Sequence, residues 1–295
     1  MKKVIIIGLT IAAIFSSCKK DEVDYAAIEQ KTLSEYLQLN YPNVTADKDG
    51  LYTVEETEGT GISPLPESYV LVNYSIAKIS GPINKIIFDT NNETIARDNR
   101  LYSDRIHYTP TVWKANEMLN GIKLALNKMK EGGKAKFIMP SNLAYGDKEA
   151  GYLPAYSTLI VEIELVKVID NIDTYETNVI LKHIEDSPLE FNLTESGVYL
   201  AITGEGKGEK YKEGATISLV CTGKYLDGKV FNSRSTLELT IGQNQVIPGF
   251  EAAVKELKSG SKATVIIPYK MGYGTKGKSP IKGYETLVFE LEMPN

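Results

Sequence analysis

Two stretches of the chain have the same order of apolar and polar positions and end in the same turn. Residues 137–146 read FIMPSNLAYG and residues 265–274 read VIIPYKMGYG. Each apolar run ends at a proline, which cannot donate to a sheet ladder and so marks the end of a strand. The glycine after the tyrosine permits the positive φ of a sharp turn. Both stretches therefore predict a strand whose end presents a tyrosine side chain.

The pattern belongs to a repeat of constant spacing. Gly50 and Gly197 are 147 residues apart, whereas Tyr145 and Tyr273 are 128 residues apart, so the first copy holds 147 − 128 = 19 extra residues. Extra residues that fall in loops between matching strands are typical of a duplicated domain. The sequence therefore predicts two similar domains.

Strand and helix signals predict a mostly β structure with one helix in each copy. Residues 69–72 and 217–220 are rich in strand-forming side chains, and Leu226–Lys229 has the Asp-Gly signal of a hairpin turn. Apolar residues at spacings of three or four predict one helix over residues 117–129 and another over residues 250–257.

The N-terminal residues have the pattern of an export signal. A positively charged start, Met1–Lys3, precedes an almost uninterrupted apolar run of twelve residues, Val4–Phe15, and two small residues then lead to Cys18. Twelve residues are too few for a membrane-spanning helix, which needs about 20. The segment resembles a bacterial lipoprotein signal with lipid on Cys18; the alternative is a plain secretory signal with an incidental cysteine. We expect lipid anchoring to a bacterial membrane, in the cell envelope, on the periplasmic or outer-membrane face.

Composition and charge argue against several classes of partner and site. The net charge of −5 has both signs interspersed, which argues against a nucleic-acid partner. With two histidines and two cysteines, we expect no metal site and no cofactor. If Cys18 carries lipid, Cys221 has no disulfide partner within the chain, and we expect it to be buried and inert.

Longer motifs resemble those of FKBP-type peptidyl-prolyl cis-trans isomerases. The second copy has VIPGFE at 246–251, IIPYKMGYG at 266–274 and TLVFELE at 286–292, and the first has MPSNLAYG at 139–146 and TLIVEIEL at 158–165. The resemblance implies an α+β fold in which each domain is an antiparallel sheet wrapped on a short helix. Its substrates would be proline-containing polypeptides.

The expected organisation has five parts. Short helical patterns at Tyr25–Leu37 and Tyr175–Ile184 are interpreted as packing helices or spacers. The parts are a signal peptide (1–18), a helical spacer (19–47), the first FKBP-like domain (48–170), a linker with a helix (171–192) and the second FKBP-like domain (193–295).

The resemblance also implies the site residues. In the second copy Tyr273 would donate its hydroxyl to a substrate carbonyl, and Ile247 would offer its backbone N–H. The apolar pocket of that copy would consist of Phe231, Val246, Ile247, Phe250, Ile281 and Phe289.

In the first copy Tyr145 would be the donor. The matching pocket positions are Phe88, Met118, Leu119, Ile122, Leu153 and Val161. The family pairs a strand tyrosine with an aspartate, and Tyr74 and Asp89 preserve that pair here. The second copy has Cys221 and Asn232 instead, whereas it keeps an aromatic floor, Phe250, where the first copy has Ile122.

Two further features of the first copy have structural interpretations. Trp113 does not align with the floor position and is interpreted as packing in the core or a loop. The insert at residues 91–108 is expected to be a solvated loop, with a cover over the first pocket as the alternative.

The resemblance implies a peptidyl-prolyl isomerase that assists the folding of exported envelope proteins. Twisting an amide needs no nucleophile, so the lack of a Ser/His/Asp or Cys/His set agrees with this interpretation. The alternative is a module that binds proline-containing segments, or acts as a chaperone, without catalysis. A purely structural envelope protein is a third possibility.

Overall fold

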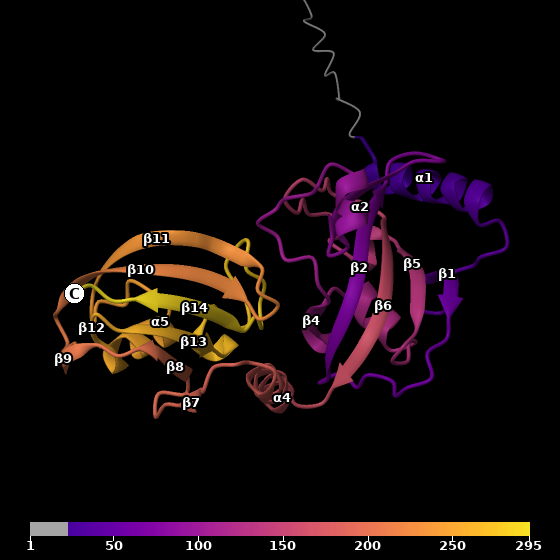
Figure 1. Ribbon diagram of the computed structural model, residues 1–295. Helices are drawn as coiled ribbons and strands as arrows, with labels where there is room; N and C mark the ends of the chain where they lie inside the picture. The colour runs from indigo at the N-terminus through magenta and orange to yellow at the C-terminus, as the bar shows by residue number, and fades with distance from the viewer. Residues whose placement is uncertain (1–22) are drawn as a thin grey trace, which may run out of the picture.

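The computed structural model describes residues 23–295, so the expected signal peptide and Cys18 lie outside the described residues. Two β-rich units lie side by side, and helix α4 (Ile172–Glu185) runs beneath the gap between them (Figure 1). Helix α1 (Tyr25–Asn40) lies at the far side of the first unit. The expected α+β class with two sheet-and-helix domains is confirmed.

The first unit is a six-stranded antiparallel sheet. Five strands follow the order β1 (Tyr52–Thr57), β5 (Lys134–Met139), β6 (Leu159–Ile169), β2 (Tyr69–Ile79) and β3 (Lys85–Thr90), and β4 (Thr111–Lys114) also pairs with β2. The predicted helix over residues 117–129 is shorter in the structure. It consists of a 3-10 turn, η1 (Ala115–Glu117), and α3 (Asn120–Leu126), because Met118 and Leu119 between them have extended ψ angles of 168° and 149°.

The second unit repeats this architecture. Its sheet has the order β11 (Val230–Thr240), β10 (Thr216–Tyr225), β14 (Leu287–Glu292), β13 (Lys262–Ile267), β8 (Tyr199–Gly204) and β7 (Asn192–Leu193). A short pair, β9 (Lys207–Lys210) and β12 (Lys258–Ser259), lies beside it. Helix α5 (Pro248–Glu256) starts with a proline at its first position, where the missing N–H costs no helical hydrogen bond.

Each sheet buries one face against its own helix. Ile122 and Leu126 of α3 are buried in the first core, and Phe250 and Val254 of α5 are buried in the second. Trp113 belongs to the first of these cores, as expected. Apolar side chains at helical spacing thus produce the wrapped arrangement, because a half-apolar sheet needs a cover for that face.

The helices that precede the units pack on the opposite sheet faces. Leu33 of α1 contacts Ile138 and Ile160, and Ile180 of α4 contacts Ile266 and Val288. The remaining short helices are α2 (Glu93–Asp98) in the insert, and the 3-10 turns η2 (Ser141–Leu143) and η3 (Tyr269–Met271), which follow the strand-ending prolines. Within residues 23–295 no helix has the length and apolar character to cross a membrane.

Candidate active site

A cavity of about 290 Å³ in the second unit is lined by the residues expected to form its pocket. They come from β11, the start of α5, the turn after β13, the loop before β14, and β14 itself. The expected residues are Phe231, Val246, Ile247, Phe250, Tyr273, Ile281 and Phe289. The lining also includes Cys221 of β10, Asn232, Leu237 and Pro280, and the polar residues Gln245, Lys278 and Ser279. Segments up to 289 − 221 = 68 residues apart in sequence thus meet at one mostly apolar cavity.

Aromatic rings build the walls of this cavity. The Phe289 ring meets Phe250 edge-on at 5.1 Å between centroids and Phe231 edge-on at 5.6 Å. Edge-to-face contacts of this kind favour a fixed arrangement of rings. Gly223 makes room for them, because a Cβ at that position would lie 2.5 Å from the Phe231 ring and 3.0 Å from the Phe289 ring.

Tyr273 lies at the cavity and is half-buried. Burial raises the pKa of its phenol, so the hydroxyl remains protonated and able to donate at neutral pH. Ile247 is the N-cap residue of α5, and its position on the cavity wall follows from the start of that helix at Pro248.

The first unit brings together the polar pair that the sequence indicated. The Tyr74 hydroxyl donates a hydrogen bond to Asp89 Oδ1 at 3.1 Å. Burial and the nearby Asp89 carboxylate raise the pKa of Tyr74. Desolvation raises the pKa of Asp89, although part of its side chain is exposed to solvent. The Trp113 ring lies 4.8 Å from the Tyr74 ring and supports it from the core.

Three of the remaining pocket positions of the first unit are aliphatic and about as buried as their counterparts Phe250, Phe289 and Ile281. Ile122 is 1% exposed, Val161 is 0% exposed and Leu153 is 5% exposed. The partly buried Phe88, Met118 and Leu119 pack on the same cluster. Tyr145 is 40% exposed, so it projects from the turn into solvent.

The polar pair of the second unit has the same placement with different chemistry. Asn232 Nδ2 lies 4.0 Å from Cys221 Sγ, where the first unit joins a phenol to a carboxylate. Cys221 is 2% exposed, and burial raises its pKa, which agrees with the expected inert thiol. Neither side chain supplies a charge to the cavity.

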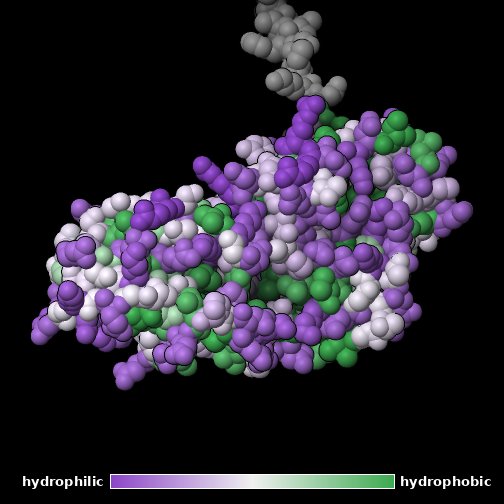
Figure 2. Space-filling view, in the orientation of Figure 1, coloured by the Kyte–Doolittle hydropathy of each residue, from purple (hydrophilic) through white to green (hydrophobic). Residues whose placement is uncertain are grey.

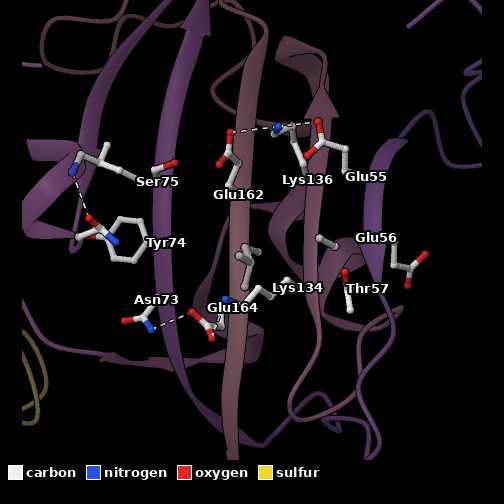
Figure 3. Close-up of a pocket in the computed structure, with 14 residues that line it drawn as sticks. Glu55, Glu56, Thr57, Asn73, Tyr74, Ser75, Lys134, Lys136, Glu162 and Glu164 are labelled. Atoms are coloured by element: carbon white, nitrogen blue, oxygen red, sulfur yellow. Dashed lines mark hydrogen bonds and ion pairs between the residues drawn. The ribbon is translucent and has the colours of Figure 1, made fainter. Parts of the chain in front are cut away.

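A polar groove of about 340 Å³ on the first unit lies on the other face of its sheet (Figure 3). All of its charged side chains except Glu56 are in ion pairs within the groove. Lys136 Nζ lies 2.7 Å from Glu55 and 3.5 Å from Glu162, and Asn73 donates to Glu164 at 3.1 Å. Tyr74 is the one aromatic residue in the lining, so the groove has no cluster of rings like that of the second-unit cavity.

The insert of the first unit makes a contact that the sequence did not predict. Its residue His107 is 7% exposed and stacks on Tyr225 of the second unit at 4.0 Å. The ring lies 2.9 Å from Asp227 and 3.5 Å from Glu285. The expectation of a solvated loop is therefore wrong for this end of the insert, because the ring finds both an aromatic partner and two carboxylates on the second unit.

Lys282 is a second residue that sequence reasoning missed. It follows Ile281 of the second cavity and reaches the first unit, where its amine donates to Thr109 O at 3.1 Å and to the Thr111 hydroxyl at 2.9 Å. Burial lowers the pKa of Lys282 to about 8. Figure 2 shows hydrophobic surface in the hollow between the units, beside this contact. No local sequence pattern predicts the contact of Lys282 with the first unit, because a lysine in a loop is usually solvated.

Comparison with known proteins yields one family. The family model described as FKBP-type peptidyl-prolyl cis-trans isomerase matches residues 89–166 and 207–294, more than half of the chain. Peptidyl-prolyl cis-trans isomerase FKBP9 of Mus musculus is 29% identical over 163 residues, which cover 55% of this chain and 26% of FKBP9.

Bacterial proteins also match. FKBP-type peptidyl-prolyl cis-trans isomerase FkpA of Escherichia coli (strain K12) is 32% identical over 102 residues, which cover 34% of this chain and 38% of FkpA. The crystal structure of FkpA from Escherichia coli aligns at 25% identity with a TM-score of 0.35, over 42% of this chain and 62% of that one. The chain thus spans about a quarter of the length of FKBP9 and less than half of that of FkpA.

The two matches to the family model fall on the two units, one on each. The second covers the cavity-lining strands and helix, and the first runs from Asp89 through most of β6. The chain therefore belongs to the FKBP-type peptidyl-prolyl cis-trans isomerase family and carries two of its domains.

Proposed function

We propose that this chain is a peptidyl-prolyl cis-trans isomerase and that the cavity of its second domain is the catalytic site. One observation carries the proposal: an apolar cavity walled by Phe231, Phe250 and Phe289 has the Tyr273 phenol at its lining. The cavity is close to the lower end of the roughly 300–1,000 Å³ range of ligand pockets, a size suited to a single ring.

The isomerisation requires an apolar environment around the amide and does not require a nucleophile. Rotation about an amide bond has a barrier of about 18–20 kcal/mol, because the planar form is stabilised by conjugation that places negative charge on oxygen. An apolar cavity removes water from this charge-separated planar form. The twisted form, with less charge on oxygen, is then relatively favoured.

A fixed donor adds to this effect. The protonated Tyr273 hydroxyl donates to a carbonyl oxygen of the substrate and orients the peptide over the cavity. The backbone N–H of Ile247, at the opening of α5, is a second donor in this proposal. Donors held in place before the substrate arrives cost little reorganisation during the reaction.

Binding without catalysis is a second function, proposed for the first domain alone. Ile122 and Val161 take the positions of the aromatic rings Phe250 and Phe289, so the first domain has aliphatic side chains where the second has aromatic walls. Tyr74 and Asp89 remain as a polar pair at the edge. Such a surface suits weak contact with a polypeptide better than desolvation of an amide.

The cellular setting is also part of the proposal. Cys18 carries lipid, the chain is anchored to a bacterial membrane in the cell envelope, and its substrates are exported proteins that fold there. The apolar segment and the small residues before Cys18 support this setting. Labelling with a radioactive fatty acid tests it: the wild type should incorporate label, and Cys18→Ser should not.

Isomerase activity is tested with the chain from residue 19 onward. Exchange between the cis and trans forms of a proline peptide, followed by NMR without a coupled protease, should accelerate at catalytic concentrations of the chain. Exchange at the uncatalysed rate, together with saturable peptide binding, would favour the binding module over the enzyme.

A further inference from the structure

A glutamate of the helix before the second domain binds the turn that presents Tyr273. Glu176 of α4 accepts a hydrogen bond at Oε1 from the Tyr269 backbone N–H at 2.7 Å and another from the Thr286 hydroxyl at 2.5 Å. Tyr269 begins η3 and Thr286 directly precedes β14. One carboxylate oxygen therefore joins the two segments of chain on either side of Tyr273.

The first domain repeats this arrangement with Glu29 of α1. Ser141 donates its backbone N–H to Glu29 Oε1 at 2.7 Å and its hydroxyl to Oε2 at 2.6 Å, and the Thr158 hydroxyl donates to Oε1 at 2.7 Å. Glu176 lies 176 − 29 = 147 residues after Glu29, which is the spacing of the repeat. The contact is therefore a property of the repeated unit.

The residue whose N–H is bound by each glutamate, Tyr269 or Ser141, also accepts a hydrogen bond from the glycine that follows the candidate tyrosine. The Gly274 N–H donates to Tyr269 O at 2.9 Å, and the Gly146 N–H donates to Ser141 O at 2.7 Å. Both glycines directly follow the candidate tyrosines and have positive φ, 69° and 65°. A shift of Tyr269 or Ser141 therefore moves the backbone that carries Tyr273 or Tyr145.

Helices α1 and α4, which carry the two glutamates, are fixed by packing and by capping. The apolar contacts of Leu33 and Ile180 with the outer sheet faces match each other across the repeat. Each helix also starts at a side-chain cap, since Asp24 accepts from the Ala27 N–H at 3.0 Å and Asn171 accepts from the Thr174 N–H at 2.9 Å. Packing and capping together fix where each glutamate lies.

We propose that Glu176 is a positioning residue for the isomerase site of the second domain, and that Glu29 has the same part for Tyr145. This inference rests on the function proposed above. Glu176 does not line the cavity, so it acts on the site through the turn and not through contact with the substrate. It fixes the turn so that the Tyr273 hydroxyl meets a substrate carbonyl, and small errors in such positions reduce rate steeply.

Kinetics of full-chain variants test the link to Tyr273. Glu176→Ala should lower kcat about two- to fivefold with little change in KM, and by no more than Tyr273→Phe does, as expected for a weakened hydrogen bond. Glu176→Gln keeps an acceptor oxygen and should stay within about twofold of the wild type. Thr177→Ala, an exposed neighbour on α4, is the matched control.

The double variant separates positioning from general support. In a Tyr273→Phe background, Glu176→Ala should cost less than about twofold, because the hydroxyl that it positions is gone. A loss that multiplies with that of Tyr273→Phe, or a Glu176→Gln as impaired as Glu176→Ala, would overturn the proposal.

Amide hydrogen exchange, read by NMR without substrate, gives a second test that does not depend on activity. Glu176→Ala should speed exchange at Tyr269 and Gly274 by about tenfold or more and leave Ser141 and Gly146 unchanged. Unchanged exchange at Tyr269 would refute the positioning claim whatever the activity. Faster exchange in a chain without isomerase activity would refute the proposed function alone.

Discussion

The two domains differ most at a pair of facing strand positions. In the first domain Ile76 pairs with Val161, and in the second Gly223 pairs with Phe289. One pair divides its bulk between two aliphatic side chains, whereas the other leaves one side empty so that an aromatic ring can fill it. The register of β10 with β14 is continuous at this glycine, so the aromatic wall forms without a shift between these two strands.

A second difference lies in the polar pair. Tyr74 and Asp89 are joined by a hydrogen bond in the first domain, while Cys221 and Asn232 are 4.0 Å apart in the second. The domain with the aromatic cavity thus lacks the carboxylate, and the domain with the carboxylate lacks the aromatic floor. In our account, desolvation by aromatic rings contributes more to catalysis than the carboxylate does.

The largest expected effect comes from removing a wall ring. Phe231→Ala should reduce kcat/KM roughly 10- to 100-fold, because about 1.5–3 kcal/mol of apolar contact with the substrate is lost. Phe88→Ala, the matched change in the first domain, should alter it less than about twofold. Both side chains are only partly buried, so circular dichroism should show that both variants fold. Equal losses in the two variants would remove the distinction between the domains.

The next effect tests the role of the glycine. Gly223→Ala places a Cβ 2.5 Å from the Phe231 ring, so the ring must move. We expect a loss of stability of about 1–3 kcal/mol and a drop in kcat/KM of about tenfold. Urea unfolding and the exchange assay measure the two quantities on one sample. Full activity in a destabilised variant would show that the ring position does not matter for catalysis.

Removing the Tyr273 hydroxyl, the candidate donor, should have a smaller effect on kcat/KM. Tyr273→Phe should lower kcat/KM about two- to tenfold, which corresponds to one hydrogen bond of about 0.5–1.5 kcal/mol. Tyr145→Phe should leave it unchanged within error, because Tyr145 is 40% exposed and Ile122 replaces the aromatic floor in its domain. The two variants are compared in the same exchange assay. A greater loss in Tyr145→Phe would move the active site to the first domain.

The smallest effect concerns the contact between the domains. His107 faces Asp227 and Glu285, with the amines of Lys229 and Lys282 nearby. Burial lowers its pKa, but hydrogen bonds to Glu285 and Asp227 outweigh burial and raise the pKa above 6.5. The stabilisation is therefore complete below pH 6.5 and is lost as pH rises through the raised pKa.

The raised pKa of His107 predicts a measurable pH dependence of stability. The wild type should exceed His107→Asn in free energy of unfolding by about 0.5–1 kcal/mol more at pH 5.5 than at pH 8.5. Thermal unfolding at both pH values measures the difference. A wild-type advantage that grows with pH instead would show that the ring is neutral in the folded protein.

The sequence could predict the cavity because its residues sit in local patterns. The proline after β13 ends the strand, the tyrosine turn follows, and the apolar spacing of α5 directs Phe250 inward. Each of these signals acts within a few residues. The repeat then strengthened every assignment by supplying a second copy at a fixed offset.

The missed residues depend on contacts between distant segments. His107 meets Asp227 across 120 residues, and Glu29 meets Ser141 across 112. A polar side chain on a helix has no local mark that separates a docking contact from a solvated position. Only the equal spacing of Glu29 and Glu176 carried a signal, and it becomes meaningful once both helices are seen to pack on the sheets.

The location of a bound proline peptide tests the central claim most directly. Titration of the isotope-labelled full chain with a proline peptide, followed by amide NMR shifts, should move the signals of Ile247, Ile281 and Phe289 first. Signals of Leu119 and Ile122 in the first domain should stay in place at the same peptide concentration. Shifts confined to Leu119 and Ile122 would contradict the account.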